Sequence, residues 1–169
     1  RLAQQNREKL TLLGSKLERM GYVGEMKSVL SELTQYRVGP ELLEKLKEAG
    51  IRITVLSNKP HAQAVDVVET LFGKGYFDAV QGQTDSVPRK PSPIGANRLA
   101  ELFQAEKKDC LYIGDTATDM ETGKAAEMET AGVLWGFRDR KELEESEACH
   151  IVEKPEELFY LAAEKENNG

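Results

Sequence analysis

Residues 111–120 read LYIGDTATDM, and the interpretation of the whole chain depends on this stretch. A short apolar run stops at a glycine, and two carboxylates follow, at Asp115 and Asp119. The apolar run predicts a strand over 109–115, and the segment after it predicts a helix over 119–128. In sheets of parallel strands, ligands bind beyond the carboxyl ends of the strands, so these carboxylates stand where a ligand could be held.

On either side of this stretch, strands alternate with helices. The predicted strands are 51–58, 77–83, 109–115, 130–136 and 149–154, and the predicted helices are 37–50, 59–73, 91–104, 119–128, 141–146 and 155–165. This alternation predicts an α/β fold, a three-layer α/β/α sandwich of Rossmann-like type around a mostly parallel sheet, with 149–154 at its edge. Ser57 and Asp115 both fall at carboxyl ends of strands, and Lys90 lies in the loop after another strand.

The composition is typical of a folded globular chain. The 169 residues suit one domain, and 40% of them are hydrophobic while 31% are charged. The net charge of −6 argues against a nucleic-acid partner, because a phosphate backbone requires a basic surface. No apolar stretch approaches the ~20 residues that span a bilayer, so no membrane partner is expected. Cys110 and Cys149 sit beside apolar runs and are expected to be buried thiols, which suits a reducing, cytoplasmic compartment.

Asp115 and Asp119 can be interpreted in two ways. Two carboxylates in one loop can bind Mg²⁺, which prefers oxygen ligands, and the metal would neutralise and orient a phosphate group. Alternatively, Asp119 only caps the following helix and Asp115 only shapes a turn. The spacing of Thr118 and Glu121 fits a capping box at this helix start. The residues by themselves leave both interpretations open.

Ser57, Asn58 and Lys90 are candidates for binding an anion. Ser57 and Asn58 stand at a strand end just before a helix, where free backbone N–H groups can cradle an anion. The alternative interpretation is that Ser57 and Asn58 form a turn closed by a local side-chain hydrogen bond. Lys90 lies in VPRKPSP (87–93), whose prolines stiffen the segment, so that its ammonium could be a fixed counter-charge to phosphate. The alternative interpretation is that Lys90 is a solvated loop lysine beside Arg89.

Three further side chains give weaker signals. His61 lies at a helix start and His150 on the edge strand, and neither has a second group at catalytic spacing. Both are expected to be surface or hydrogen-bonded histidines. Trp135 follows a strand and is expected mainly to pack.

Three segments, taken in order, resemble a known family. VLSNKP (55–60), PRKPSP (88–93) and the stretch from YIGDTATD to GFR (112–138) are similar to the second, third and fourth motifs of the haloacid dehalogenase-like hydrolases. Within that family the chain looks most like the phosphoglycolate phosphatase-like branch, which has a helical cap. The resemblance covers roughly residues 36–160, and its most specific part is GDTATD (114–119).

The resemblance implies a reaction and a role for each candidate. The reaction would be Mg²⁺-dependent hydrolysis of a small phosphorylated metabolite, phosphoglycolate-like, through an aspartyl-phosphate. Ser57 and Asn58 would bind the substrate phosphate, and Lys90 would pair with the phosphate and the nucleophile. Asp115 would ligate Mg²⁺, and Asp119 would support the metal site.

The resemblance also divides the chain into two parts. Two amphipathic helices over 1–20 and 24–36 would be a remnant of the helical cap, and 37–169 would be the α/β core. Glu127 stands where the family usually has a glycine, which would alter the turn into the next strand. The oligomeric state stays open.

The family's first motif is absent. Its members begin with a strand ending in Asp-x-Asp, whose first aspartate attacks phosphorus and whose second acts as acid and base. No Asp-x-Asp occurs in these 169 residues. In the family's sheet this strand lies between the strands that end at Ser57 and at Gly114. Without it, either those two strands pair with each other or something else fills the gap, because buried unpaired backbone groups are costly.

Three explanations for the missing motif compete. The chain is a fragment whose upstream piece carries the nucleophile, or a degenerate member that binds phosphate or a partner without catalysis, or a rearranged chain with a re-paired sheet. In each case we expect the chain by itself to be inactive. A phosphomutase, which shares the aspartyl-phosphate step, would need the same aspartate.

Overall fold

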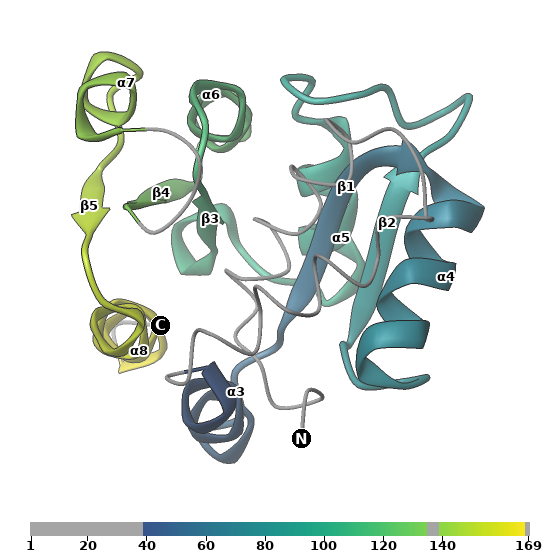
Figure 1. Cartoon of the computed structure of the whole chain (residues 1–169), viewed down its shortest axis with the longest axis horizontal. Coiled ribbons are helices and arrows are strands. Elements are labelled where there is room, and N and C mark those ends of the chain that lie inside the picture. The colour runs from purple at the N-terminus through teal and green to yellow at the C-terminus, as the bar shows by residue number, and fades with distance from the viewer. Residues whose placement is uncertain (1–38, 135–138, 168–169) are drawn as a thin grey trace.

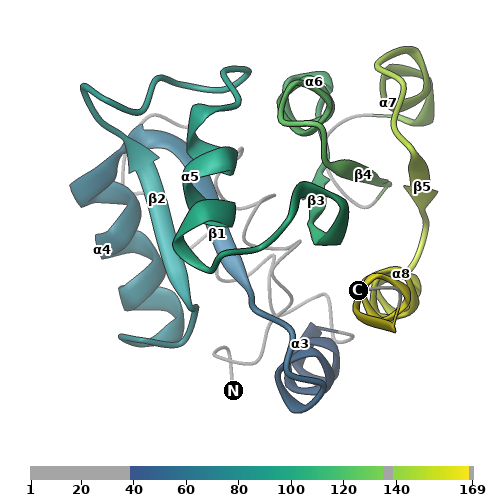
Figure 2. The same ribbon diagram turned by 180° about the vertical axis from the view of Figure 1, so that it is seen from behind.

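A computed structural model describes residues 39–134 and 139–167 (Figures 1 and 2). Its elements are α3 Gly39–Glu48, β1 Thr54–Pro60, α4 His61–Phe72, β2 Ala79–Gln83, α5 Ile94–Leu102, a 3-10 turn at Lys107–Asp109, β3 Leu111–Gly114, α6 Ala117–Ala125, β4 Glu129–Val133, α7 Arg140–Glu145, β5 His150–Val152 and α8 Pro155–Asn167. The predicted alternation of strands and helices is confirmed. The predicted cap remnant at 1–36 and Trp135 lie outside the described residues, so the domain division stays a prediction.

The strands form two parallel sheets instead of one. β1 pairs with β2, with Thr54 opposite Ala79, and β3, β4 and β5 form a second sheet in that order, with Gly114 opposite Gly132. The predicted edge position of β5 is confirmed. Within the described ranges, no strand pairs with the other edge of β1 or of β3. The first of the two expectations for this gap, that these strands pair with each other, is therefore wrong for the described residues.

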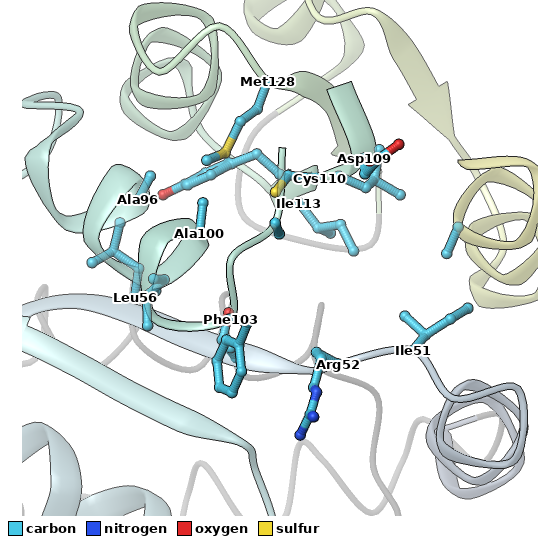
Figure 3. A pocket seen from close by; sticks show the side chains of 16 residues that line it. Ile51, Arg52, Leu56, Ala96, Ala100, Phe103, Asp109, Cys110, Ile113 and Met128 are labelled. Carbon is cyan, nitrogen blue, oxygen red and sulfur yellow. The ribbon is translucent and has the colours of Figure 1, made fainter. Parts of the chain in front are cut away.

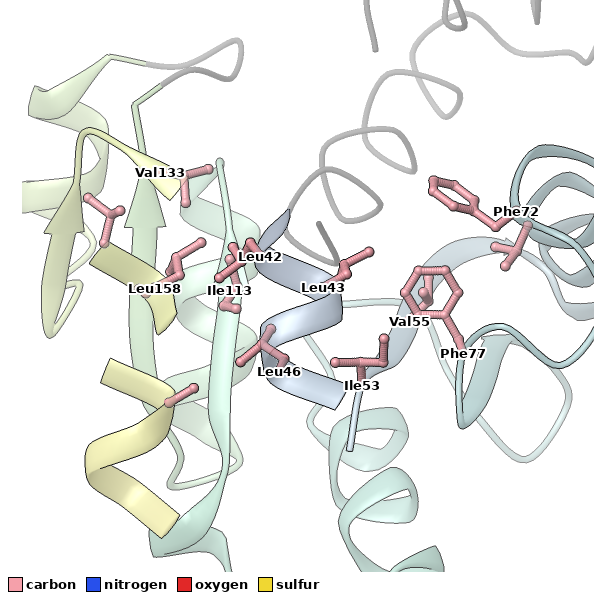
Figure 4. Close-up of a cluster of buried hydrophobic side chains, with 14 of the residues drawn as sticks. Leu42, Leu43, Leu46, Ile53, Val55, Phe72, Phe77, Ile113, Val133 and Leu158 are labelled. Atoms are coloured by element: carbon pink, nitrogen blue, oxygen red, sulfur yellow. The ribbon is translucent and has the colours of Figure 1, made fainter. Parts of the chain in front are cut away.

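One apolar cluster joins the two sheets on one face (Figure 4). It is built from α3, α4 and α8, and α3 supplies its centre with Leu42, Leu43 and Leu46, whose spacing places them on one side of the helix. Leu43 and Leu46 are fully buried, and burying such a side chain stabilises a fold by about 1.5–3 kcal/mol. Side chains of both sheets, including Val55 and Ile113, complete the cluster. Helix packing thus connects two sheets whose described strands do not pair with each other.

A second cluster covers the opposite face. Ala96 and Ala100 of α5 pack with Ala126 and Met128, which follow α6. Leu56 of β1 and Tyr112 of β3 lie against this cluster. Helices therefore cover both faces of the strands, which confirms the predicted three-layer α/β/α fold. None of the described helices combines the length and the hydropathy needed to cross a bilayer.

The prediction of buried thiols is wrong. Cys110 is partly buried and Cys149 is exposed, and both are free of disulfides. Each cysteine precedes its strand by one residue and so lies in the polar turn before it, outside the buried run.

Glu127 has a left-handed backbone, with a φ of 61°. It follows α6, where the Glu127 N–H donates to the Lys124 carbonyl (2.9 Å) and the Met128 N–H donates to the Gly123 carbonyl (2.9 Å). This pair of bonds is a Schellman motif, whose left-handed residue is usually glycine. Glu127, which replaces the family's usual glycine, thus lies at a position where a residue with a side chain strains the backbone.

Glu127→Gly should therefore raise the free energy of unfolding by about 0.5–1 kcal/mol, because it removes the left-handed strain at some cost in backbone entropy. Glu127→Ala is the matched control, since it removes the same exposed carboxylate but keeps the strain. Urea denaturation of the three proteins measures the difference. Equal stabilities for the glycine and alanine variants would contradict the strain at this position.

Candidate active site

A buried ion pair connects two distant segments at the strand ends. Lys90 Nζ lies 3.0 Å from Asp119 Oδ1, and the side chains of Lys90 and Asp119 are 4% and 1% exposed. Lys90 comes from the loop after β2, and Asp119 from the first turn of α6. Removing one partner of a buried pair leaves an uncompensated charge, so the pair fixes both segments. The alternative of a solvated loop lysine is therefore wrong.

Asp119 also makes three hydrogen bonds within the loop that follows β3. Its Oδ2 accepts hydrogen bonds from the Asp115 N–H (3.2 Å) and from Thr116 Oγ1 (3.0 Å), while the Asp119 N–H donates to Thr116 Oγ1 (3.2 Å). The helix cap is thus Thr116, and the predicted capping box at Thr118 and Glu121 is wrong. Thr116 has the extended backbone that a cap residue needs, whereas Thr118 already lies inside α6. Both oxygens of Asp119 are held by protein donors.

Asn58 attaches the end of β1 to the same loop. Its Oδ1 accepts from the Lys90 N–H at 2.6 Å, and its Nδ2 donates to the Lys90 carbonyl at 3.5 Å. Ser57 Oγ accepts from the Lys59 N–H at 3.1 Å. Ser57 therefore makes the local contact that was one of the two interpretations, whereas Asn58 makes a long-range contact with the Lys90 backbone. Phosphate binding by Ser57 and Asn58 stays a prediction.

These contacts set the relative direction of the two sheets. Lys90 is held by Asn58 at the carboxyl end of β1 and by Asp119, which follows the carboxyl end of β3. The carboxyl ends of β1 and β3 consequently lie at one edge, and both strands run toward it. This edge is the place where open α/β sheets bind ligands.

Lys59 is a charged group that the sequence reasoning missed. It is only 6% exposed, although it is the last residue but one of its strand. None of the ion pairs between described residues includes it. The signal for it was available, because Val55, Ser57 and Lys59 follow the period of two that places strand residues on one face. A lysine at the strand end with no carboxylate paired to it among the described residues favours an anionic ligand.

Lys59→Met should weaken the binding of inorganic phosphate roughly tenfold, because it removes a cation from the strand end, and it should not lower the free energy of unfolding, because no ion pair between described residues is lost. Lys124→Met is the control, since Lys124 is 61% exposed. Phosphate titration and urea denaturation measure the two effects. Unchanged phosphate affinity in Lys59→Met would exclude Lys59 from the anion site.

Asp115 and Asp119 fit a magnesium site in which the protein supplies few of the ligands. Asp115 is fully buried at the end of β3. No group of three or more His, Cys, Asp or Glu side chains suited to a metal occurs among the described residues. Mg²⁺ is usually held by one or two carboxylates, waters and substrate phosphates, so this set suffices. Asp115 would supply the ligand, and Asp119, whose oxygens are engaged, would orient Asp115 through its backbone N–H.

Three other polar residues have structural partners. His61 Nδ1 accepts from the Gly82 N–H (3.0 Å), and His150 Nε2 lies 3.1 Å from Glu129 Oε1. His61 is thus hydrogen-bonded, as the sequence predicts, and His150 faces a carboxylate of the neighbouring strand β4. Glu142 of α7 accepts from the Ala117 N–H (3.1 Å) at the start of α6. A carboxylate at a helix N-terminus is favourable, and Glu142 thereby stabilises the turn that carries Asp119.

Comparisons with known proteins agree with this geometry. The sequence profile of the haloacid dehalogenase-like hydrolases matches residues 2–127. The phosphoglycolate phosphatase of Aquifex aeolicus is 37% identical over 98 residues, which are 58% of this chain and 46% of that protein. Pyrophosphatase PpaX of Listeria welshimeri is 26% identical over 134 residues, 79% of this chain and 62% of that protein.

A solved structure shows the same fold. The crystal structure of a predicted phosphatase from Clostridium acetobutylicum superposes with a TM-score of 0.68 at 23% identity, over 91% of this chain and 77% of that one. The chain spans about half the length of the curated relatives it matches. The profile match covers well over half of the 169 residues, and the chain belongs to the haloacid dehalogenase-like hydrolase family.

Proposed function

We propose that the chain carries the phosphate- and metal-holding part of a Mg²⁺-dependent phosphomonoester hydrolase that acts on a small, phosphoglycolate-like metabolite in the cytoplasm. The observation that carries this proposal is the convergence of Lys90, Asp119 and Asp115, all buried, at the carboxyl ends of β1 and β3. The named activities of the Aquifex and Listeria relatives support a phosphate substrate. The two free cysteines, one of them exposed, support a reducing compartment.

Each residue has a distinct part in holding the phosphate. Asp119 fixes the Lys90 ammonium, and Asn58 fixes the Lys90 backbone, so the cation is in place before the phosphate binds. Lys59, a largely buried residue, adds a second lysine at the end of β1. Mg²⁺, when bound at Asp115, would neutralise further phosphate charge. The absence of Asp-x-Asp leaves the chain without the family's nucleophile, so it should bind phosphate without hydrolysing an ester.

Isothermal titration of the chain with inorganic phosphate and MgCl₂ tests this. Lys90→Met should lower phosphate affinity at least roughly tenfold, because it removes a charge-assisted contact, while the exposed Lys124→Met variant should bind normally. Circular dichroism checks that each variant is folded. Normal affinity in a folded Lys90→Met variant would refute the assignment of the anion site. Mg²⁺-dependent turnover of p-nitrophenyl phosphate by the pure chain would refute its predicted inactivity.

The second candidate function is a non-catalytic phosphate-binding module, which the absence of Asp-x-Asp favours. The longest gene product that contains these residues distinguishes the candidates. Release of inorganic phosphate from phosphoglycolate would support the hydrolase, and phosphate binding without turnover would support the module. Transfer of phosphate within a sugar phosphate would instead identify a phosphomutase.

A further inference from the structure

The carboxyl end of β1 carries a β-bulge beside β2. The pairing of the two strands is irregular between Leu56 and Pro60, where β1 has residues 57–59 and β2 has only Gly82. Figure 1 shows β1 bending across the end of β2 before α4 begins. A bulge bends its strand, interrupts the ladder of hydrogen bonds and redirects side chains, and bulges are common beside active sites. We call residues 57–59 the β1 bulge.

The β1 bulge contains three of the residues assigned to the proposed phosphate site. Asn58 Oδ1 accepts from the Lys90 N–H (2.6 Å), and the Lys90 ammonium pairs with Asp119. Ser57 and Lys59 are each only 6% exposed, and the Lys59 N–H donates to Ser57 Oγ (3.1 Å) within the bulge. The shape of the bulge therefore decides where these side chains lie relative to a bound phosphate.

Gly82 lies in backbone contact with the end of the β1 bulge and with the residue that begins α4. A Cβ at Gly82 would lie 2.5 Å from His61 Cα and 2.7 Å from the Lys59 carbonyl oxygen, and both of these are backbone atoms. Such distances leave no room for a side chain, so this close approach requires glycine. The backbone of β2 thus supports the bulge directly.

His61 supplies a hydrogen-bond acceptor at the same point. The buried Gly82 N–H donates to His61 Nδ1 at 3.0 Å, although the two residues are 21 positions apart. A backbone N–H can only donate, so Nδ1 uses its lone pair and the neutral imidazole carries its proton on Nε2. A buried N–H that loses its acceptor is costly. This bond therefore attaches the first residue of α4 to the strand opposite the bulge.

We propose that His61 is a positioning residue, whose bond to Gly82 holds the β1 bulge in the shape that binds phosphate. The bulge is fixed before its first residue, where Leu56 is still in the regular ladder with β2, and after its last one, where His61 is bound to Gly82. Groups that are fixed in advance bind an anion more tightly, because less ordering is needed when the anion arrives. This inference rests on the proposed function, since the anion is the phosphate of that site.

Two substitutions of similar shape test the hydrogen bond. At the place of His61 Nδ1, asparagine puts the accepting Oδ1 and leucine puts a methyl group, because each of these atoms is bonded to Cγ. His61→Leu should weaken the binding of inorganic phosphate to the full chain about fivefold to tenfold, the effect of one hydrogen bond. His61→Asn should bind within about twofold of the wild type, because it keeps the acceptor. Isothermal titration measures the affinities.

Thr130→Val is the matched structural control. Thr130 Oγ1 accepts from the Cys149 N–H at 2.9 Å, so valine also removes the side-chain acceptor of a backbone N–H, but in the sheet of β3, β4 and β5. Thr130→Val and His61→Leu should both lower the free energy of unfolding in urea. Only His61→Leu should lower phosphate affinity in folded protein. Equal losses of phosphate affinity in the two variants would overturn the proposal, because His61 would then act through stability alone.

Amide hydrogen exchange of the wild-type chain is a second measurement, and it needs no variant. Saturating phosphate should slow exchange of the Gly82 amide at least about threefold more than that of the Cys149 amide, because phosphate stabilises the bulge and the bond that supports it. Equal effects on the two amides would overturn the proposal, also where His61→Leu fails to fold.

The affinities separate this inference from the proposed function. Normal phosphate affinity in a folded His61→Leu variant would overturn the inference and leave the proposed function standing. Equally weak binding by His61→Leu and His61→Asn would overturn it as well, since the acceptor would then not be the cause. A wild-type chain that binds no phosphate would overturn the proposed function and the inference together.

Discussion

Asp119→Asn should lower the free energy of unfolding by about 3–5 kcal/mol, the cost of leaving one buried charge without its partner. Asp119 accepts from Lys90 through Oδ1 and from Asp115 and Thr116 through Oδ2. An asparagine of the same shape has one accepting oxygen, so its amide group must face a donor on one side. Because domains of this size are stable by about 5–15 kcal/mol, the loss is a large part of the total.

Two controls distinguish the loss of stability caused by breaking the buried ion pair from the loss caused by removing any charge. Glu144→Gln breaks an exposed pair with Arg140 and should change stability by less than about 0.5 kcal/mol. Asp119→Leu combined with Lys90→Met removes both charges and should cost less than Asp119→Leu alone. Urea denaturation monitored by circular dichroism measures all of these proteins. An Asp119→Asn loss as small as that of Glu144→Gln would contradict the buried pair.

Gly114→Ala should cost about 2–4 kcal/mol and abolish phosphate binding, because overpacking typically costs 1–3 kcal/mol and here it also displaces a buried ionic group. A Cβ at Gly114 would lie 2.5 Å from Asp119 Cγ and 2.6 Å from Asp119 Oδ2. These distances leave no space, so the Asp119 carboxylate must leave its position beside Lys90. Glycine at this position is therefore required by the close approach of α6 to the end of β3.

Gly132→Ala is a matched control, since Gly132 lies opposite Gly114 in the neighbouring strand. Its Cβ would lie 3.0 Å from both Leu143 methyl carbons and 3.3 Å from Leu143 Cβ, and the methyl groups of a flexible side chain can move. Gly132→Ala should cost about 1 kcal/mol and leave phosphate binding intact. Equal phosphate affinities in the two variants would show that Gly114 does not act through Asp119. Gly114→Ala and Asp119→Asn together should cost less than the sum of the single losses, because both act on one carboxylate.

Local sequence patterns are enough to predict the elements of the fold and the order of the site residues. The period of two before Ser57 and the spacing of Leu42, Leu43 and Leu46 are local patterns, and local patterns decide whether a segment forms a strand or a helix. The alternation of the two then requires parallel strands with helices on both faces. The strand-end positions of Ser57 and Asp115 follow from the same patterns, as do the order of the motifs and the absence of Asp-x-Asp.

The way these residues are used depends instead on contacts between distant segments. The Lys90–Asp119 pair joins residues that are 29 positions apart, and the cap at Thr116 displaced the expected one because Asp119 is held by Asp115 and Thr116 together. The separation of the strands into two sheets depends on which edges find partners, and no local pattern specifies a partner. The cavity of about 410 Å³ between the two sheets (Figure 3) has the same origin, since its walls come from segments more than 50 residues apart in the sequence, between Leu56 and Leu111.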